Sequence, residues 1–195
     1  MSRAVHPIEV ESYRILRSRV DLSHLPPLTR AVTERVVHAS ADLDYVTDLV
    51  CAEDALAAGL AALRGGAPVV TDVWMVAAGI TGREAVCPVA EPAAAELARA
   101  TGLTRSAAAV RIAYGRVGPG AVWVVGCAPT ALVEVIDLGV EPALVVGLPV
   151  GFVGAAESKA ALRASGLPAV SNVGEKGGSA VAAAALNALL YLEEK

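Results

Sequence analysis

His38 has the surroundings of a residue that could transfer protons. It stands near the end of a predicted helix, in the segment Glu34-Arg-Val-Val-His38-Ala-Ser-Ala-Asp42-Leu-Asp44. An imidazole changes charge near neutral pH, and carboxylates within a helical turn can orient its ring and tune its basicity. That combination is suited to general acid or base catalysis. From the spacing alone, however, a histidine on the surface or at an interface is the favoured interpretation.

Two other places could bind a polar or acidic ligand. Thr71 and Asp72 end an apolar strand, where side chains of an α/β sheet project into the ligand crevice, but Asp72 could equally cap the next helix. Thr104 precedes a helix whose first turn has free backbone N–H groups, so Arg105 and Ser106 could hold a carboxylate. Judged by the residues alone, an ordinary threonine cap beside a solvated arginine is the favoured alternative.

Three glycine-rich turns each join an apolar strand to a helix. Their residues that could meet a ligand are Gly126, Cys127, Thr130, Lys159, Lys176 and Ser179. Small residues let a large flat ligand approach the backbone, or simply let a helix pack tightly on a strand. Lys159 and Lys176 could pair with substrate carboxylates. The turns contain neither GxxxxGK[ST] nor GxGxxG after a strand, which disfavours a nucleotide-dependent enzyme.

The elements that must position these residues alternate along the chain. Apolar periodicity, proline starts and glycine stops predict helices at 7–19, 28–38, 53–64, 93–101, 104–114, 129–138, 153–165 and 179–192. Strand-like runs fall at 68–71, 121–125, 142–148 and 168–170. This alternation predicts one α/β domain over residues 1–195, with a doubly wound, mainly parallel sheet of about five strands flanked by helices.

Composition narrows the function classes. Hydrophobic residues make up 55% of the 195 residues and charged residues 18%, with a net charge of −4. No basic run indicates nucleic-acid binding, and no apolar segment of about 18 residues indicates a membrane span. Three cysteines without a CxxC pair favour a reducing cytoplasm, and three scattered histidines indicate no protein-bound metal. The high apolar fraction leaves surface that subunits could bury.

Seven segments resemble motifs of the precorrin-8X methylmutases of corrin biosynthesis, in the same order and at similar spacing. They are HPIEVESYRIL, ERVVHASADLDY, TDVWMVAAGI, LTRSAAA, GCAPTAL, LVVGLPVGFVGAAESK and GEKGGSAVAAAALNAL. The resemblance spans nearly the whole chain. It implies an isomerase that moves a methyl group within ring C of precorrin-8X or cobalt-precorrin-8, with no cofactor.

The resemblance also implies roles for single residues. His38 aligns with the family's proposed general acid, which reverses the simpler interpretation of this histidine. For Asp72, the resemblance mildly favours substrate binding over helix capping. It also makes Arg105 the best candidate for holding a substrate carboxylate. A homodimer is expected, in which an active site shared across the two-fold axis is possible.

Two residues depart from the family's usual pattern. Cys127 stands where the family usually has asparagine, a much better hydrogen-bonding group than a thiol, and Glu175 stands where arginine is common. An acid in place of a base would repel a polyacidic substrate. These departures motivate an alternative function, a corrinoid-binding or carrier protein without catalysis.

Overall fold

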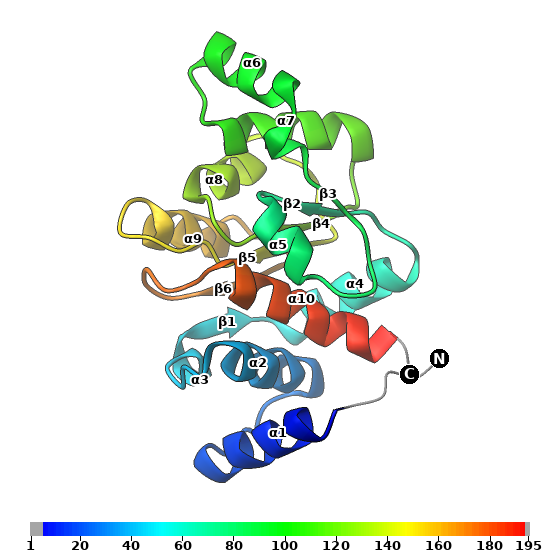
Figure 1. Cartoon of the computed structure of the whole chain (residues 1–195), viewed down its shortest axis with the longest axis vertical. Helices are drawn as coiled ribbons and strands as arrows, with labels where there is room; N and C mark the ends of the chain where they lie inside the picture. Colours follow the sequence, from blue (N-terminus) through cyan, green and yellow to red (C-terminus); the bar gives the residue numbers. More distant parts are fainter. Residues whose placement is uncertain (1–5, 194–195) are drawn as a thin grey trace.

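A six-stranded sheet forms the centre of the computed structural model, which describes residues 6–193 (Figure 1). The strands are β1 (Leu49–Cys51), β2 (Val69–Thr71), β3 (Ala85–Val86), β4 (Val122–Val125), β5 (Leu144–Gly147) and β6 (Ala169–Asn172). They lie in the order β1-β6-β5-β4-β2-β3. Every pair is parallel except β1 with β6. The predicted mainly parallel α/β sheet is confirmed, with six strands in place of about five.

The two strands that the sequence analysis did not predict are the edge strands β1 and β3. They have three and two residues, and their residues are only partly buried or exposed. A short edge strand has neither the continuous apolar run of a buried strand nor a long alternation of apolar and polar residues. Its sequence therefore resembles that of a loop.

Helices cover both faces of the sheet. They are α1 (Pro7–Arg19), α2 (Pro27–Ser40), α3 (Tyr45–Asp48), α4 (Glu53–Arg64), α5 (Trp74–Gly79), α6 (Pro92–Thr101), α7 (Arg105–Val117), α8 (Pro129–Asp137), α9 (Ala155–Ala164) and α10 (Ser179–Glu193). Residues of α2, α4, α5 and α10 pack in one core cluster, and residues of α7, α8 and α9 in the other. The predicted arrangement of a sheet flanked by helices is confirmed.

The central strands supply both clusters because their side chains alternate between the two faces. On β4, Val122 and Val124 belong to the first cluster, and Trp123 and Val125 belong to the second. All four β4 residues are buried, which explains why the strand reads as a continuous apolar run. None of the helices within residues 6–193 is long and apolar enough to span a membrane.

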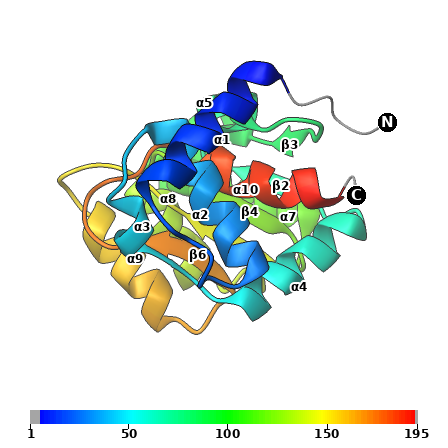
Figure 2. The same ribbon diagram turned by 90° about the horizontal axis from the view of Figure 1, so that it is seen from below.

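Helix α10 is buried between the sheet and α2. The sheet, α10 and α2 are thus three successive layers on this side of the molecule. Its alanine-rich sequence allows close contact on both sides, and Val181 through Leu190 are all buried. Helix α1 packs outside α2, and Figure 2 shows the two N-terminal helices in front of α10. Helix α2, which carries His38 in its last turn, therefore lies in an outer helical layer.

Candidate functional site

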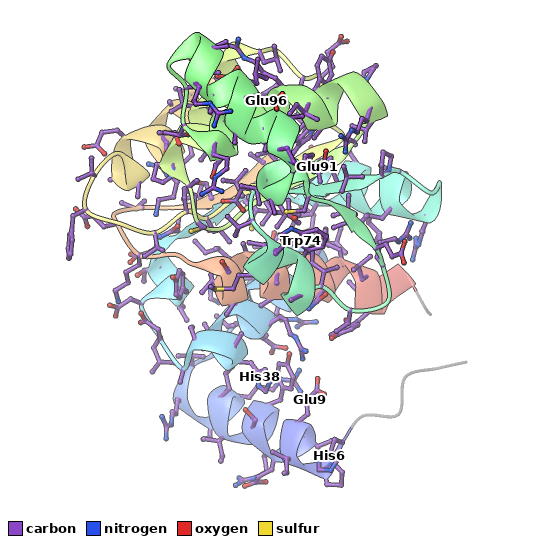
Figure 3. The ribbon with its side chains drawn as sticks, turned by 45° about the horizontal axis from the view of Figure 1, so that its top comes forward. His6, Glu9, His38, Trp74, Glu91 and Glu96 are labelled. Atoms are coloured by element: carbon purple, nitrogen blue, oxygen red, sulfur yellow. The ribbon has the colours of Figure 1, made fainter. Side chains whose placement is uncertain are left out.

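His38 lies in the last turn of α2, where α1 meets it. Its Nδ1 is 2.8 Å from the Oγ of Ser12, and its ring stacks on Tyr13 with centroids 4.9 Å apart and planes 8° apart. Figure 3 shows His38 between these two helices, well apart from Trp74 on α5. The hydrogen bond and the stacked ring together fix the plane of the imidazole, as a group that transfers protons requires.

Ion pairs tie α1 to α2 and so present Ser12 and Tyr13 to His38. Arg35 of α2 donates to the carboxylate of Glu9 at 2.6 Å and to the hydroxyl of Tyr13 at 3.3 Å. Arg17 of α1 makes a bidentate pair with Glu34, with both N–O distances under 3 Å. Burial raises the pKa of the Tyr13 phenol, so the ring beside His38 stays uncharged.

A small cavity of about 110 Å³ opens beside His38. Its lining consists of Ser12, Ile15, Leu16, Arg19, Val37, His38, Ala41 and Leu43. Ser12 and Ile15 also line an apolar hollow of about 490 Å³ that runs along α1 past Ile8. The cavity itself is smaller than the roughly 300 Å³ of the smallest ordinary small-molecule pockets. A large ligand at His38 must therefore extend over the surface of α1.

Asp72, at the end of β2, is buried and binds the turn that begins α8. Its carboxylate accepts hydrogen bonds from the backbone N–H groups of Gly126 (3.1 Å), Cys127 (2.8 Å) and Ala128 (2.7 Å). Burial raises the pKa of this carboxyl, and the three amide donors oppose that rise. Asp72 therefore does not cap the next helix, α5, which has no side-chain cap, and instead fixes the turn that precedes α8. Thr71 is buried beside it.

The starts of α7 and α8 meet at the same turn. Thr104 caps α7 by accepting from the N–H of Ala107, and its hydroxyl lies 2.7 Å from that of Thr130. Arg105 follows at the first position of α7, exposed and without an ion-pair partner among residues 6–193. Ser106 is half-buried next to it. We call this region, from Asp72 across residues 126–130 to Arg105, the α8 turn.

Gly126 and Ser179 lie against each other. A methyl group on Gly126 would come within 2.9 Å of the Cα of Ser179 and 2.8 Å of the side chain of Ala182. Of the two explanations offered for the small residues, tight packing of helix on strand is the one this geometry supports for Gly126. Ser179 is 8% exposed, whereas Cys127 is exposed at the surface of the α8 turn.

Lys159 and Lys176 were predicted to meet substrate carboxylates, and both ammonium groups have partners inside the chain. Lys159 is fully buried and donates to Asn172 Oδ1 at 3.0 Å and to the carbonyl of Lys176 at 2.5 Å. Burial lowers its pKa to about 8. Lys176 forms ion pairs with Asp42 at 2.7 Å and with Asp44 at 2.5 Å. The prediction for Lys159 does not fit, because a ligand cannot reach it in this conformation.

The structure brings the predicted residues together in two groups. The α8 turn collects Asp72, Gly126, Cys127, Thr130 and Arg105. Near the end of α2, Lys176 joins the glycine turn before α10 to the segment that follows His38. Ser12 and Tyr13, the partners of His38 on α1, were not predicted from the sequence. Only the packing of α1 on α2 shows that they face this histidine. Within residues 6–193, no three His, Cys, Asp or Glu side chains are grouped as metal ligands.

Comparisons with known proteins agree with this architecture. A family model described as precorrin-8X methylmutase matches residues 7–192. The cobalt-precorrin-8 methylmutase of Salmonella typhimurium is 42% identical, over 94% of this chain and 93% of its own. The precorrin-8X methylmutase of Pseudomonas aeruginosa is 42% identical, over 92% and 91%.

A solved structure gives the same result in three dimensions. The crystal structure of the precorrin-8X methylmutase from Thermus thermophilus superposes with a TM-score of 0.88 at 38% identity, covering 96% of this chain and 95% of the other. The family-model match over residues 7–192 includes the segments that carry His38, the α8 turn and the glycine turn before α10. The chain belongs to the precorrin-8X methylmutase family.

Proposed function

We propose that this chain is the isomerase that moves a methyl group within ring C of precorrin-8X or cobalt-precorrin-8, a step of cobalamin biosynthesis. Relatives named for each of these two substrates are equally similar to it, at 42% identity. The observation that carries the proposal is the imidazole of His38, held in plane by Ser12 and Tyr13 beside a surface hollow.

The reaction requires the protein only to bind the substrate and to place one proton. The methyl group leaves an alpha carbon of ring C and bonds to the adjacent beta carbon, so substrate and product are isomers and no electrons enter or leave. His38 acts as the general acid that protonates or polarises ring C, which lowers the barrier to migration, and a proton that it donates returns to it as the product forms. Binding the bent macrocycle more tightly than the relaxed one supplies the remainder of the acceleration.

Arg105 holds a peripheral carboxylate of the substrate in this proposal. Its guanidinium is exposed and unpaired within the described chain, and the first turn of α7 beside it offers backbone N–H groups to an anion. Cys127 and Thr130 line the same turn and contact the macrocycle there. Asp72 contributes indirectly, because its bonds to residues 126–128 fix the backbone that the ligand meets.

A homodimer is part of the proposal. The cavity at His38 is too small to enclose a tetrapyrrole, so a second copy of the chain covers the part of the ligand that lies outside it. Phe152 and Val153, in the turn before α9, are 96% and 89% exposed, and such large apolar side chains favour burial against another subunit. The three cysteines are unpaired, which supports the proposed cytoplasmic location.

The test is to mix the purified protein with precorrin-8X in one experiment and cobalt-precorrin-8 in another, and to follow the visible spectrum. Conversion to the product chromophore in either is the expected result, because the new corrin conjugation changes the absorption. Tight binding of both compounds without conversion would contradict the proposal in favour of a carrier. Light scattering of the same sample gives the mass, and a monomer with full activity would contradict the proposed dimer.

A further inference from the structure

The loop 173–178, between β6 and α10, is held by two lysines that act on opposite sides of it. From the interior, the buried ammonium of Lys159 donates to the carbonyl of Lys176 and to the side chain of Asn172. Asn172 in turn donates to the carbonyls of Val173 and Lys176. The backbone at Lys176 is thereby fixed by contacts with the protein interior.

The side chain of Lys176 points outward from this fixed point and binds the segment after α2. Its ammonium lies 2.7 Å from Asp42 and 2.5 Å from Asp44. The two carboxylates hold the pKa of Lys176 above its usual range, and the Lys176 ammonium lowers the pKa of Asp42. Two acids around one ammonium leave no net positive charge here to attract a substrate carboxylate.

The segment that Lys176 binds is a wall of the His38 cavity. Ala41 and Leu43, on either side of Asp42, both line that cavity. Ala41 ends α2 in the left-handed conformation, with φ at 54°, which costs energy for a residue other than glycine. The turn after it is held by hydrogen bonds from Asp42 N–H to Ser40 and from Asp44 N–H to Asp42. The position of this wall therefore depends on what Asp42 and Asp44 contact.

An isolated surface ion pair contributes little, because each side chain must lose conformational freedom to form it. Lys176 differs in two respects. Its backbone is already fixed by Lys159, and both of its acidic partners belong to one short turn. Part of the conformational entropy that Lys176 must lose is therefore already lost before the ion pair forms. The same ammonium also restrains two residues of the turn at once.

We propose that Lys176 is a positioning residue, which latches the loop 173–178 onto the turn 41–44 and so fixes the wall of the His38 cavity. Its predicted role as a ligand of the substrate is replaced by this one. The catalytic part of the consequence rests on the proposed methylmutase function, whereas the restraint on the turn does not.

A double-mutant cycle tests the latch, with Lys176→Met on one side and Asp42→Asn with Asp44→Asn on the other. If the two sides form one unit, each change alone speeds hydrogen exchange of the amides of residues 41–46 by about threefold to tenfold, and the combined variant exchanges no faster than either. Lys176→Arg keeps the two charge contacts and retains the slow exchange. Additive effects on exchange, or no effect of Lys176→Met, would overturn the proposal.

Kinetics separate positioning from substrate binding. For a latch, Lys176→Met and the double aspartate variant both lower kcat by about threefold to tenfold and leave KM nearly unchanged. If Lys176→Met instead raises KM while the aspartate variant does not, Lys176 is a substrate ligand and the proposal fails. Arg116→Met is the matched control, because its surface pair with Glu91 has similar exposure and lies on other elements. A wild-type protein that converts neither substrate would refute the proposed function, and the exchange cycle would still decide the latch.

Discussion

The α8 turn and the region around His38 use polar side chains in opposite ways. At the α8 turn, Asp72 is buried and its two oxygens accept three backbone hydrogen bonds. At His38, the ring lies between two surface helices beside an open cavity, and two side chains of α1 hold it. The carboxyl edge of a parallel sheet is where α/β proteins usually bind ligands. Here the carboxylate at that edge stabilises the backbone, and the proposed general acid, His38, lies on α2 instead.

This difference teaches that a polar residue at a strand end is not by itself a ligand contact. Asp72 follows that pattern in the sequence, and its carboxylate is engaged inside the chain. The same holds for Lys159, a predicted ligand contact on α9 whose ammonium is also engaged inside the chain. Arg105, in the same region, is exposed and is the proposed contact for a substrate carboxylate. Changes at Asp72 should therefore affect stability, changes at Arg105 should affect binding, and changes near His38 should affect turnover.

The largest effect is expected for His38→Ala. Loss of the general acid should lower kcat by about 10²- to 10⁴-fold, while binding of the product chromophore changes little. Ser12→Ala, which removes only the bond that orients the ring, should lower kcat by about threefold to tenfold, the equivalent of one hydrogen bond. Steady-state kinetics and spectral titration measure both. A fully active His38→Ala variant would exclude the general-acid role.

Asp72→Asn is expected to have the next largest effect, on stability. An amide has one acceptor oxygen where the carboxylate has two, so at least one of the three backbone donors, of which Gly126 N–H is buried, loses its partner. We expect the free energy of unfolding to fall by about 3 kcal/mol, since hydrogen bonds to charged acceptors are strong and buried donors are costly to leave unpaired. Thr104→Ala, which removes an exposed cap nearby, should cost about 1 kcal/mol. Denaturant unfolding of both variants makes the comparison, and equal losses would show that Asp72 is no special anchor.

Lys159 gives a prediction on pH. Its folded-state pKa is about 8, below the usual 10.5, so the unfolded chain binds more protons between these values. The free energy of unfolding of the wild type should therefore rise with pH from about 8 to 10.5, relative to Lys159→Met, by about 1 to 3 kcal/mol. Subtracting the two unfolding curves removes the titration of other groups. A difference that is flat over this range would contradict the lowered pKa.

Arg105→Ala should have the smallest effect, and it should appear in binding alone. Losing one contact to a peripheral carboxylate raises KM by about tenfold and leaves kcat unchanged, because that contact is the same in the ground and transition states. Arg99→Ala, on the exposed side of α6, provides a control for the loss of one surface charge. If Arg105→Ala lowers kcat at saturation instead, the α8 turn takes part in catalysis and the contrast between the two regions weakens.

Much of this protein could be predicted from its sequence, because local patterns carry the information. Continuous apolar runs at 121–125 and 142–148 indicated strands buried on both faces, and β4 and β5 lie within them. Pro7, Gly65 and Thr104 marked helix ends through their own backbone preferences. The order of the motifs indicated the family, and the resemblance to the family singled out His38 as the candidate general acid.

Other properties depend on contacts between distant segments, and only the tertiary structure could decide them. The carboxylate of Asp72 meets an amide 56 residues away at Ala128, Lys176 meets Asp42 134 residues away, and His38 meets Ser12 26 residues away. The strand end left two roles open for Asp72, and in the structure its carboxylate binds the turn between β4 and α8. Side-chain type and spacing determine what each residue can do. Which partner it meets is decided by how the layers pack, because a hydrogen bond or ion pair extends over only about 3 Å.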